Sequence, residues 1–216
     1  MPFTTDEFLN VFEQYNLWVW PMQLILNLLA IVAFWFLVFG KKNKSKVINA
    51  ILVFLWLWMG MVYHLLFFSE INKAAYIFGF LFLVQSFLFA WYGLIKAKNI
   101  KYQFRLDLYG VLGLLFIIYA LIIYPILSIY FGHEYPKMPT FGLPCPTVIF
   151  TIGILLFAFD RIPGIVILIP FLWSLIGFFA AVNLTIKEDF GLLIAGILGT
   201  TVLLFFRRKT IYEKNS

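Results

Sequence analysis

The sequence predicts an all-α integral membrane protein, a bundle of seven transmembrane helices preceded by a short amphipathic helix. Hydrophobic residues make up 63% of the 216 residues and charged residues only 12%, whereas a soluble domain carries about 25% charged residues. The mean hydropathy is +0.97. Uncharged runs of about 20 residues recur along the chain, long enough to cross a bilayer as helices. Basic residues gather in alternate loops between these runs, which gives the bundle a direction.

The predicted spans lie within a single transmembrane domain, residues 1–216. They cover residues 17–40, 47–68, 74–95, 108–131, 141–159, 164–183 and 190–206. None of these runs contains an Asp, Glu, Lys or Arg. They show no alternation of polar and apolar residues, so we expect helices, whose backbone groups are hydrogen-bonded within each segment.

The loops predict the orientation of the bundle. On one side lie 13 of the 16 basic residues, namely Lys41, Lys42, Lys44, Lys46, Lys96, Lys98, Lys101, Arg105, Arg161, Arg207, Arg208, Lys209 and Lys214. The other side holds Lys73, Lys137 and Lys187 with seven acidic residues, Asp6, Glu7, Glu13, Glu70, Glu134, Glu188 and Asp189. The positive-inside rule assigns the basic side to the cytoplasm. We therefore expect the N-terminus outside and the C-terminus in the cytoplasm.

The pattern of residues 1–16 predicts a short helix that lies on the outer surface of the membrane. Thr4 and Glu7 have the spacing of a capping box, and Phe3 and Phe8 that of a hydrophobic staple. Apolar residues then recur at helical spacing up to Tyr15. Such an amphipathic helix would lie in the membrane interface, and the alternative is a frayed polar tail.

The segment 132–147, GHEYPKMPTFGLPCPT, is the longest predicted outer loop. Its four prolines exclude ordinary helix and favour a stiff, ordered cap. Pro146 suits a first helical position, which would put Cys145 at the N-cap of the fifth span. At that position the helix dipole would favour the thiolate form of Cys145, whereas apolar surroundings would favour the neutral thiol. A small buried residue is the simpler interpretation of Cys145.

The predicted sidedness gathers a set of polar residues at the outer end of the bundle. His64 is the only strongly titratable side chain inside a span, and it lies one turn from that end. The candidate polar pocket comprises His64, Glu70, His133, Glu134 and Cys145, with Gln23 and Asn27 from the first span. Glu188 and Asp189 lie at the same level. This grouping follows from sidedness and from no motif.

Three interpretations of this set remain open. His64, His133 and Cys145 are ligand types that suit a transition metal, although no closely spaced ligand pair is present; two-His haem ligation is weaker still. The set could instead line a polar vestibule for a small solute that enters from outside. In the third interpretation His64 hydrogen-bonds across helices, and the acidic residues form a solvated rim.

The sequence lacks the residues that several activities require. The last span has no Lys for a retinal Schiff base, and one Cys excludes a CxxC redox centre. HEYPK lacks the second His of a zinc-protease HExxH motif. The basic residues lie in short loops between apolar runs, which argues against nucleic-acid binding. We favour a non-enzymatic protein; the sequence requires no cofactor, and a metal ion is the candidate.

Four stretches resemble a known family. They are YNLWVWPMQ, WLWMGMVYHLLFFSEINKAAYIFG, YPILSIYFGHEYPKMPTFGLPCPTVIFTIG and LIPFLWSLIGFFAAVNLTIKEDFGLLIAG. They are similar to an uncharacterised family of bacterial multi-pass membrane proteins, known only as a domain of unknown function. The similarity extends over nearly the whole chain and implies a bacterial inner-membrane protein. It implies no activity and no catalytic residues.

Two functional hypotheses follow. In the first, an outer-leaflet polar pocket binds or transports a small solute or metal ion. In the second, the chain is a membrane assembly or interaction protein whose loop 132–147 docks a periplasmic partner. The lipid bilayer is the expected surrounding in both hypotheses, and a homo-oligomer is compatible with either.

Overall fold

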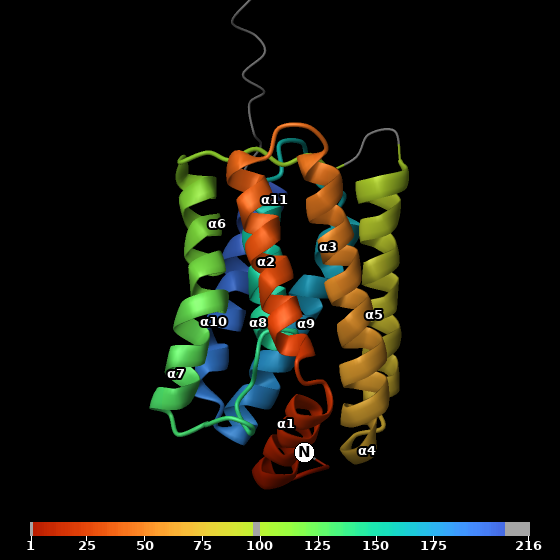
Figure 1. Cartoon of the computed structure of the whole chain (residues 1–216), viewed down its shortest axis with the longest axis vertical. Coiled ribbons are helices and arrows are strands. Elements are labelled where there is room, and N and C mark those ends of the chain that lie inside the picture. Colours follow the sequence, from red (N-terminus) through yellow and green to blue (C-terminus); the bar gives the residue numbers. More distant parts are fainter. Residues whose placement is uncertain (1, 97–99, 206–216) are drawn as a thin grey trace, which may run out of the picture.

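The computed structural model describes residues 2–96 and 100–205, and these residues form a bundle of long helices joined by short connections (Figure 1). Six of the helical segments are apolar and long enough to cross a membrane: Met22–Phe39, Lys44–Ile71, Ala75–Ile95, Leu108–Tyr130, Gly164–Leu184 and Lys187–Phe205. Large apolar side chains such as Ile31, Phe80 and Phe179 are exposed on their outer faces. An exposed apolar surface of this kind belongs in lipid, so these helices indicate a multi-pass membrane protein.

The long segments are built from consecutive helical elements. The first is α2 (Met22–Phe39) and the second comprises α3 (Lys44–Trp58), the π-helix η1 (Met59–Phe68) and α4 (Ser69–Ile71). The third joins α5 (Ala75–Ala90) to η2 (Trp91–Ile95), and the fourth joins α6 (Leu108–Ile118), η3 (Tyr119–Ile123) and α7 (Tyr124–Tyr130). After α9 (Gly164–Leu184) the last contains η4 (Lys187–Asp189), α10 (Phe190–Ile194), η5 (Ala195–Gly199) and α11 (Thr200–Phe205). These segments match six predicted spans, apart from residue 206, which lies outside the described residues.

The predicted span 141–159 has a different structure. Only Pro144–Leu155, helix α8, is helical, and its 12 residues measure about 18 Å, against about 30 Å of hydrocarbon. The helix starts at Pro144 because proline fits the first turn, where its missing N–H costs no bond. It ends where the chain turns to pair with another loop, through Phe159 N to Lys101 O at 2.7 Å and Gln103 N to Phe157 O at 2.9 Å. The described residues thus contain six membrane-length helices, and the seventh predicted span holds one short central helix.

Helix α8 lies in the middle of the bundle and is buried at every position except Cys145. Its closest helix contact is with α6, where a Cβ on Gly153 would lie 2.9 Å from the Gly113 carbonyl oxygen, and one on Gly113 would lie 2.7 Å from that of Gly153. The two backbones approach this closely because neither residue carries a side chain. Since protein surrounds α8, the irregular backbone at its ends is shielded from lipid.

The segments that carry the two sets of charged residues lie at opposite ends of the bundle (Figure 1). At one end Tyr102 N donates to Ser45 Oγ at 3.0 Å, and Asn49 Nδ2 donates to Ile100 O at 3.0 Å. This basic end carries the described members of the basic set, which are Lys41, Lys42, Lys44, Lys46, Lys96, Lys101, Arg105 and Arg161. Lys98, Arg207, Arg208, Lys209 and Lys214 lie outside the described residues. The other end, which we call the α1 end, carries the acidic set.

Helix α1 (Thr5–Trp18) caps the α1 end of the bundle. The capping box is present, with Glu7 N donating to Thr4 Oγ1 at 3.2 Å and Thr4 N donating to Glu7 Oε2 at 2.7 Å. The hydrogen bonds from Thr4 hold the pKa of Glu7 below its usual value. On the opposite face Tyr15 is fully buried, and its hydroxyl accepts from Trp58 Nε1 at 2.8 Å. The helix therefore packs on protein, and its position relative to a membrane surface stays a prediction.

Candidate functional site

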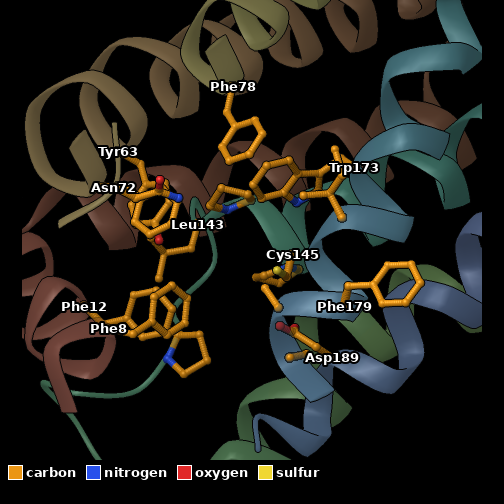
Figure 2. Close-up of a pocket in the computed structure, with 18 of the residues that line it drawn as sticks. Phe8, Phe12, Tyr63, Asn72, Phe78, Leu143, Cys145, Trp173, Phe179 and Asp189 are labelled. Carbon is orange, nitrogen blue, oxygen red and sulfur yellow. The ribbon is translucent and has the colours of Figure 1, made fainter. Parts of the chain in front are cut away.

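A cavity of about 340 Å³ lies at the α1 end, between α1, η1, α5, α9 and the chain that leads into α8 (Figure 2). Nine aromatic residues line it: Phe3, Phe8, Phe12, Tyr63, Phe68, Phe78, Tyr124, Trp173 and Phe179. We call it the aromatic cavity. Ile176 and Phe179 belong both to its lining and to the exposed apolar surface of α9. The cavity therefore reaches the lipid-facing side of the bundle.

The polar groups of the aromatic cavity gather on one wall. Figure 2 shows Cys145 and Asp189 together on the side opposite Phe8 and Phe12. Asp189 is 5% exposed and its carboxyl group accepts a hydrogen bond from the Tyr124 hydroxyl. Cys145 is the second residue of α8 and the only cysteine of the chain. Cys145 therefore lies next to the Asp189 carboxyl group in the wall of the cavity.

Glu188 forms a second polar cluster directly behind this wall. It is fully buried, and its Oε1 accepts from Ser128 Oγ at 2.9 Å and lies 2.8 Å from His133 Nδ1. The Glu188 main-chain carbonyl accepts from the Tyr119 hydroxyl at 2.7 Å. These contacts join η4 to η3, α7 and the loop that follows α7. A buried carboxylate needs such partners, and they fix the position of the neighbouring Asp189.

His64 lies in η1 and is fully buried. Its ring packs against aromatic rings, with centroid distances of 4.6 Å to Phe82 and 5.0 Å to Trp173. Neither ring nitrogen has a hydrogen-bond partner in the part of the chain that the structure describes. Trp173 lies between His64 and the aromatic cavity, because it contacts the first and lines the second. The predicted hydrogen bond from His64 across helices is not present.

The loop from 132 to 143 is anchored to α1 through Asn16. The Asn16 Nδ2 group donates to Pro136 O at 2.7 Å and to Met138 O at 2.8 Å. Thr140 Oγ1 donates to Asn16 Oδ1 at 2.8 Å. This loop is therefore an ordered cap, and its apolar residues Phe141 and Leu143 are buried beneath it.

The predicted pocket residues are dispersed over this end of the molecule. Glu70 and Glu134 are exposed, so neither lines a pocket. Gln23 Nε2 donates to Asn16 O at 2.6 Å, and Asn27 Nδ2 donates to Gln23 O at 2.9 Å within α2. Of the predicted residues, only Cys145 lines the aromatic cavity.

The predicted metal set is also not assembled. Within residues 2–96 and 100–205, no three His, Cys, Asp or Glu side chains are grouped so that they could hold a metal ion. His133 pairs with Glu188, Cys145 with Asp189, and His64 with aromatic rings. The three side chains were predicted to share a membrane level, but the structure turns them toward different neighbours.

Sequence reasoning placed Glu188 and Asp189 at this end but left them out of the candidate pocket, and it missed Asn16. One interpretation put the acidic residues in a solvated rim, yet Glu188 and Asp189 are buried. Their position immediately before an apolar run of membrane length was the available signal. The sequence carried no comparable signal for Asn16, because a single Asn in a surface helix is ordinary.

The fold indicates a multi-pass membrane protein with an aromatic cavity near one end of its bundle. The chain belongs to a family of unknown function (DUF6064), whose model matches residues 5–214. This confirms the resemblance seen in the sequence. The chain matches no curated protein and no solved structure.

Proposed function

We propose that this protein binds a small, mainly apolar molecule in the aromatic cavity, within the membrane. The observation that carries this proposal is the cavity itself, about 340 Å³ and lined largely by aromatic and aliphatic side chains. Ligand sites in proteins are concave, mostly apolar and about 300–1,000 Å³, with a few placed polar groups. Asp189, Cys145 and Tyr124 supply such groups on one wall. The site is therefore more apolar than the polar pocket expected from sequence.

The route of entry follows from the lining. Ile176 is 37% exposed and Phe179 is 66% exposed, and both sit on the face of α9 that an apolar molecule in the bilayer would meet. A ligand that partitions into lipid would reach the cavity without crossing water. In this proposal the protein binds its ligand and does not transform it.

The same proposal places the chain in the bacterial inner membrane with the basic end in the cytoplasm. The positive-inside rule supports this orientation. Helix α8 then completes a seventh crossing inside the protein, because Leu143 packs at the α1 end and Phe157 pairs with the basic end. Green fluorescent protein fused to the C-terminus should fluoresce, because this proposal puts the C-terminus in the cytoplasm. The same protein fused to the N-terminus would be exported and should not fluoresce. The reverse pattern would contradict the orientation.

Docking of a periplasmic partner through residues 132–147 has less support. Phe141, Leu143, Pro144 and Pro146 are buried, so the loop offers Tyr135, 49% exposed, as its large exposed apolar side chain. We therefore retain the cavity as the functional site.

Mass spectrometry of the intact protein, released from lipid nanodiscs, tests the proposal. The wild type should retain a small molecule that the variant Ala180→Phe loses, because Ala180 lines the cavity and a phenyl ring would fill it. Val182→Phe is the matched control, since Val182 is 50% exposed on the same helix and lies outside the lining. Equal retention by wild type and Ala180→Phe would overturn the proposal.

A further inference from the structure

The lining of the aromatic cavity has a chemical preference beyond its size. The electron-rich faces of Phe, Tyr and Trp attract cations, and recognition of substituted ammonium groups by several aromatic side chains is a recurring use of this attraction. Phe8, Phe12, Tyr63, Phe78 and Trp173 come from four different elements and surround one space (Figure 2). Uncharged apolar ligands need no such enrichment in aromatic over aliphatic residues.

Asp189 adds a carboxyl group to this space. Its carboxylate is almost fully buried and lines the cavity. Among residues 2–96 and 100–205, the ion pairs are Arg105 with Asp107, His133 with Glu188 and Lys137 with Glu13, so Asp189 takes part in none. The hydrogen bond to its carboxyl group comes from an uncharged donor, the Tyr124 hydroxyl, and Cys145 lies beside it in the cavity wall.

Lys187 and His133 are the basic residues considered as partners for Asp189, and each contacts a different residue. Lys187, two residues before Asp189, is exposed and its Nζ lies 5.3 Å from the centroid of the Phe131 ring. The His133 ring contacts Glu188. An ionised carboxylate buried without a cation is costly, so a positively charged ligand beside Asp189 would favour its ionised form.

We infer that the aromatic cavity selects an organic cation, with a substituted ammonium group against Asp189 and an apolar body among the aromatic rings. This inference rests on the proposed function and names its ligand class. The ammonium group could belong to a lipid headgroup or to a free lipophilic amine, and the chemistry of recognition is the same.

Alkylation of Cys145 by N-ethylmaleimide provides the test, because this single cysteine lies beside Asp189 in the cavity wall. The protein is placed in nanodiscs of phosphatidylglycerol, which carries no amine. Two probes of equal shape are then compared, phenethyltrimethylammonium and its uncharged isostere (3,3-dimethylbutyl)benzene. Cation attraction in a desolvated site predicts that the ammonium probe protects Cys145 at a concentration about tenfold lower.

The variant Asp189→Asn should remove this preference while the uncharged isostere protects as before. The wild-type comparison of the two probes needs no variant, so it holds if Asp189→Asn does not fold. Equal protection by the two probes in the wild type would overturn the inference and leave the proposed function standing. Protection by neither probe would overturn both.

The two sources of the ammonium group are separated by a second set of nanodiscs that contain phosphatidylethanolamine. If this lipid slows alkylation without added probe, the ligand is a lipid headgroup. If the rate is unchanged and the ammonium probe still protects, the ligand is a free amine.

Discussion

The Nδ1 atom of His133 lies 2.8 Å from Oε1 of Glu188, a carboxylate with no solvent exposure. This contact joins the loop after α7 to the start of the last membrane-length helix. It places Glu188 so that Asp189, the next residue, faces the aromatic cavity.

Replacing His133 tests this contact. In His133→Ala the Glu188 Oε1 atom keeps only Ser128 as a side-chain partner, which should cost about 1–3 kcal/mol of stability. For a chain of this length that lowers the midpoint of thermal unfolding by about 2–4 °C per kcal/mol. Glu134→Ala, at the exposed neighbouring residue, should leave the midpoint unchanged. The contact contributes nothing if the two variants unfold together.

Asn16 should control the order of the loop from 132 to 143. Asn16→Ala removes its hydrogen bonds to Pro136, Met138 and Thr140. Local opening of the loop should rise, and trypsin should cleave after Lys137 about tenfold faster. Asn10→Ala is the control, because Asn10 is exposed on the same helix. Cleavage at an equal rate in both variants would show that Asn16 does not anchor the loop.

His64 should be dispensable for folding. Its ring nitrogens have no partner among the described residues, and an apolar side chain at a buried polar position of that kind is neutral or stabilising. We expect His64→Leu to unfold at the wild-type temperature or above it. Phe82→Leu, in the same aromatic cluster, should lose about 1 kcal/mol or more through lost packing. If His64→Leu is the less stable of the two, His64 has a partner that this account omits.

The contact between α6 and α8 should tolerate no side chain. Gly153→Ala places a methyl group 2.9 Å from the Gly113 carbonyl oxygen, and overpacking of this kind costs about 1–3 kcal/mol. At Gly164 nothing lies within 4 Å of an added Cβ, so Gly164→Ala is the matched control. Thermal unfolding of both variants measures the difference, and equal midpoints would rule out a tight backbone contact.

Sequence reasoning predicted the six membrane-length helices to within a few residues at most of their ends, because the bilayer demands long apolar runs and separates charges by side. It could not see where α8 stops, since residues 141–143 and 156–159 are as apolar as the helix. Helix α8 begins at Pro144. Beyond its C-terminal end the backbone is hydrogen-bonded to Lys101 and Gln103. That pairing joins residues more than fifty positions apart in the sequence.

Sequence reasoning also could not predict which side chains meet in the candidate site. Sidedness placed His64, His133 and Cys145 at one level, but the rotation of each helix decides which neighbours its side chains meet. Cys145 meets Asp189, and His133 meets Glu188. Hydropathy does not encode that rotation; it is set by packing between helices, including the contact of Gly113 with Gly153.

The central claim is that an accessible cavity exists beside Cys145, and the rate of Cys145 alkylation measures it most directly. N-ethylmaleimide should modify the folded wild type in nanodiscs, and Val182→Phe should react at the same rate. Ala180→Phe, which fills the cavity, should react at least about tenfold more slowly, because chemical access to a buried thiol follows its exposure. A rate in Ala180→Phe equal to that of the wild type would contradict the account.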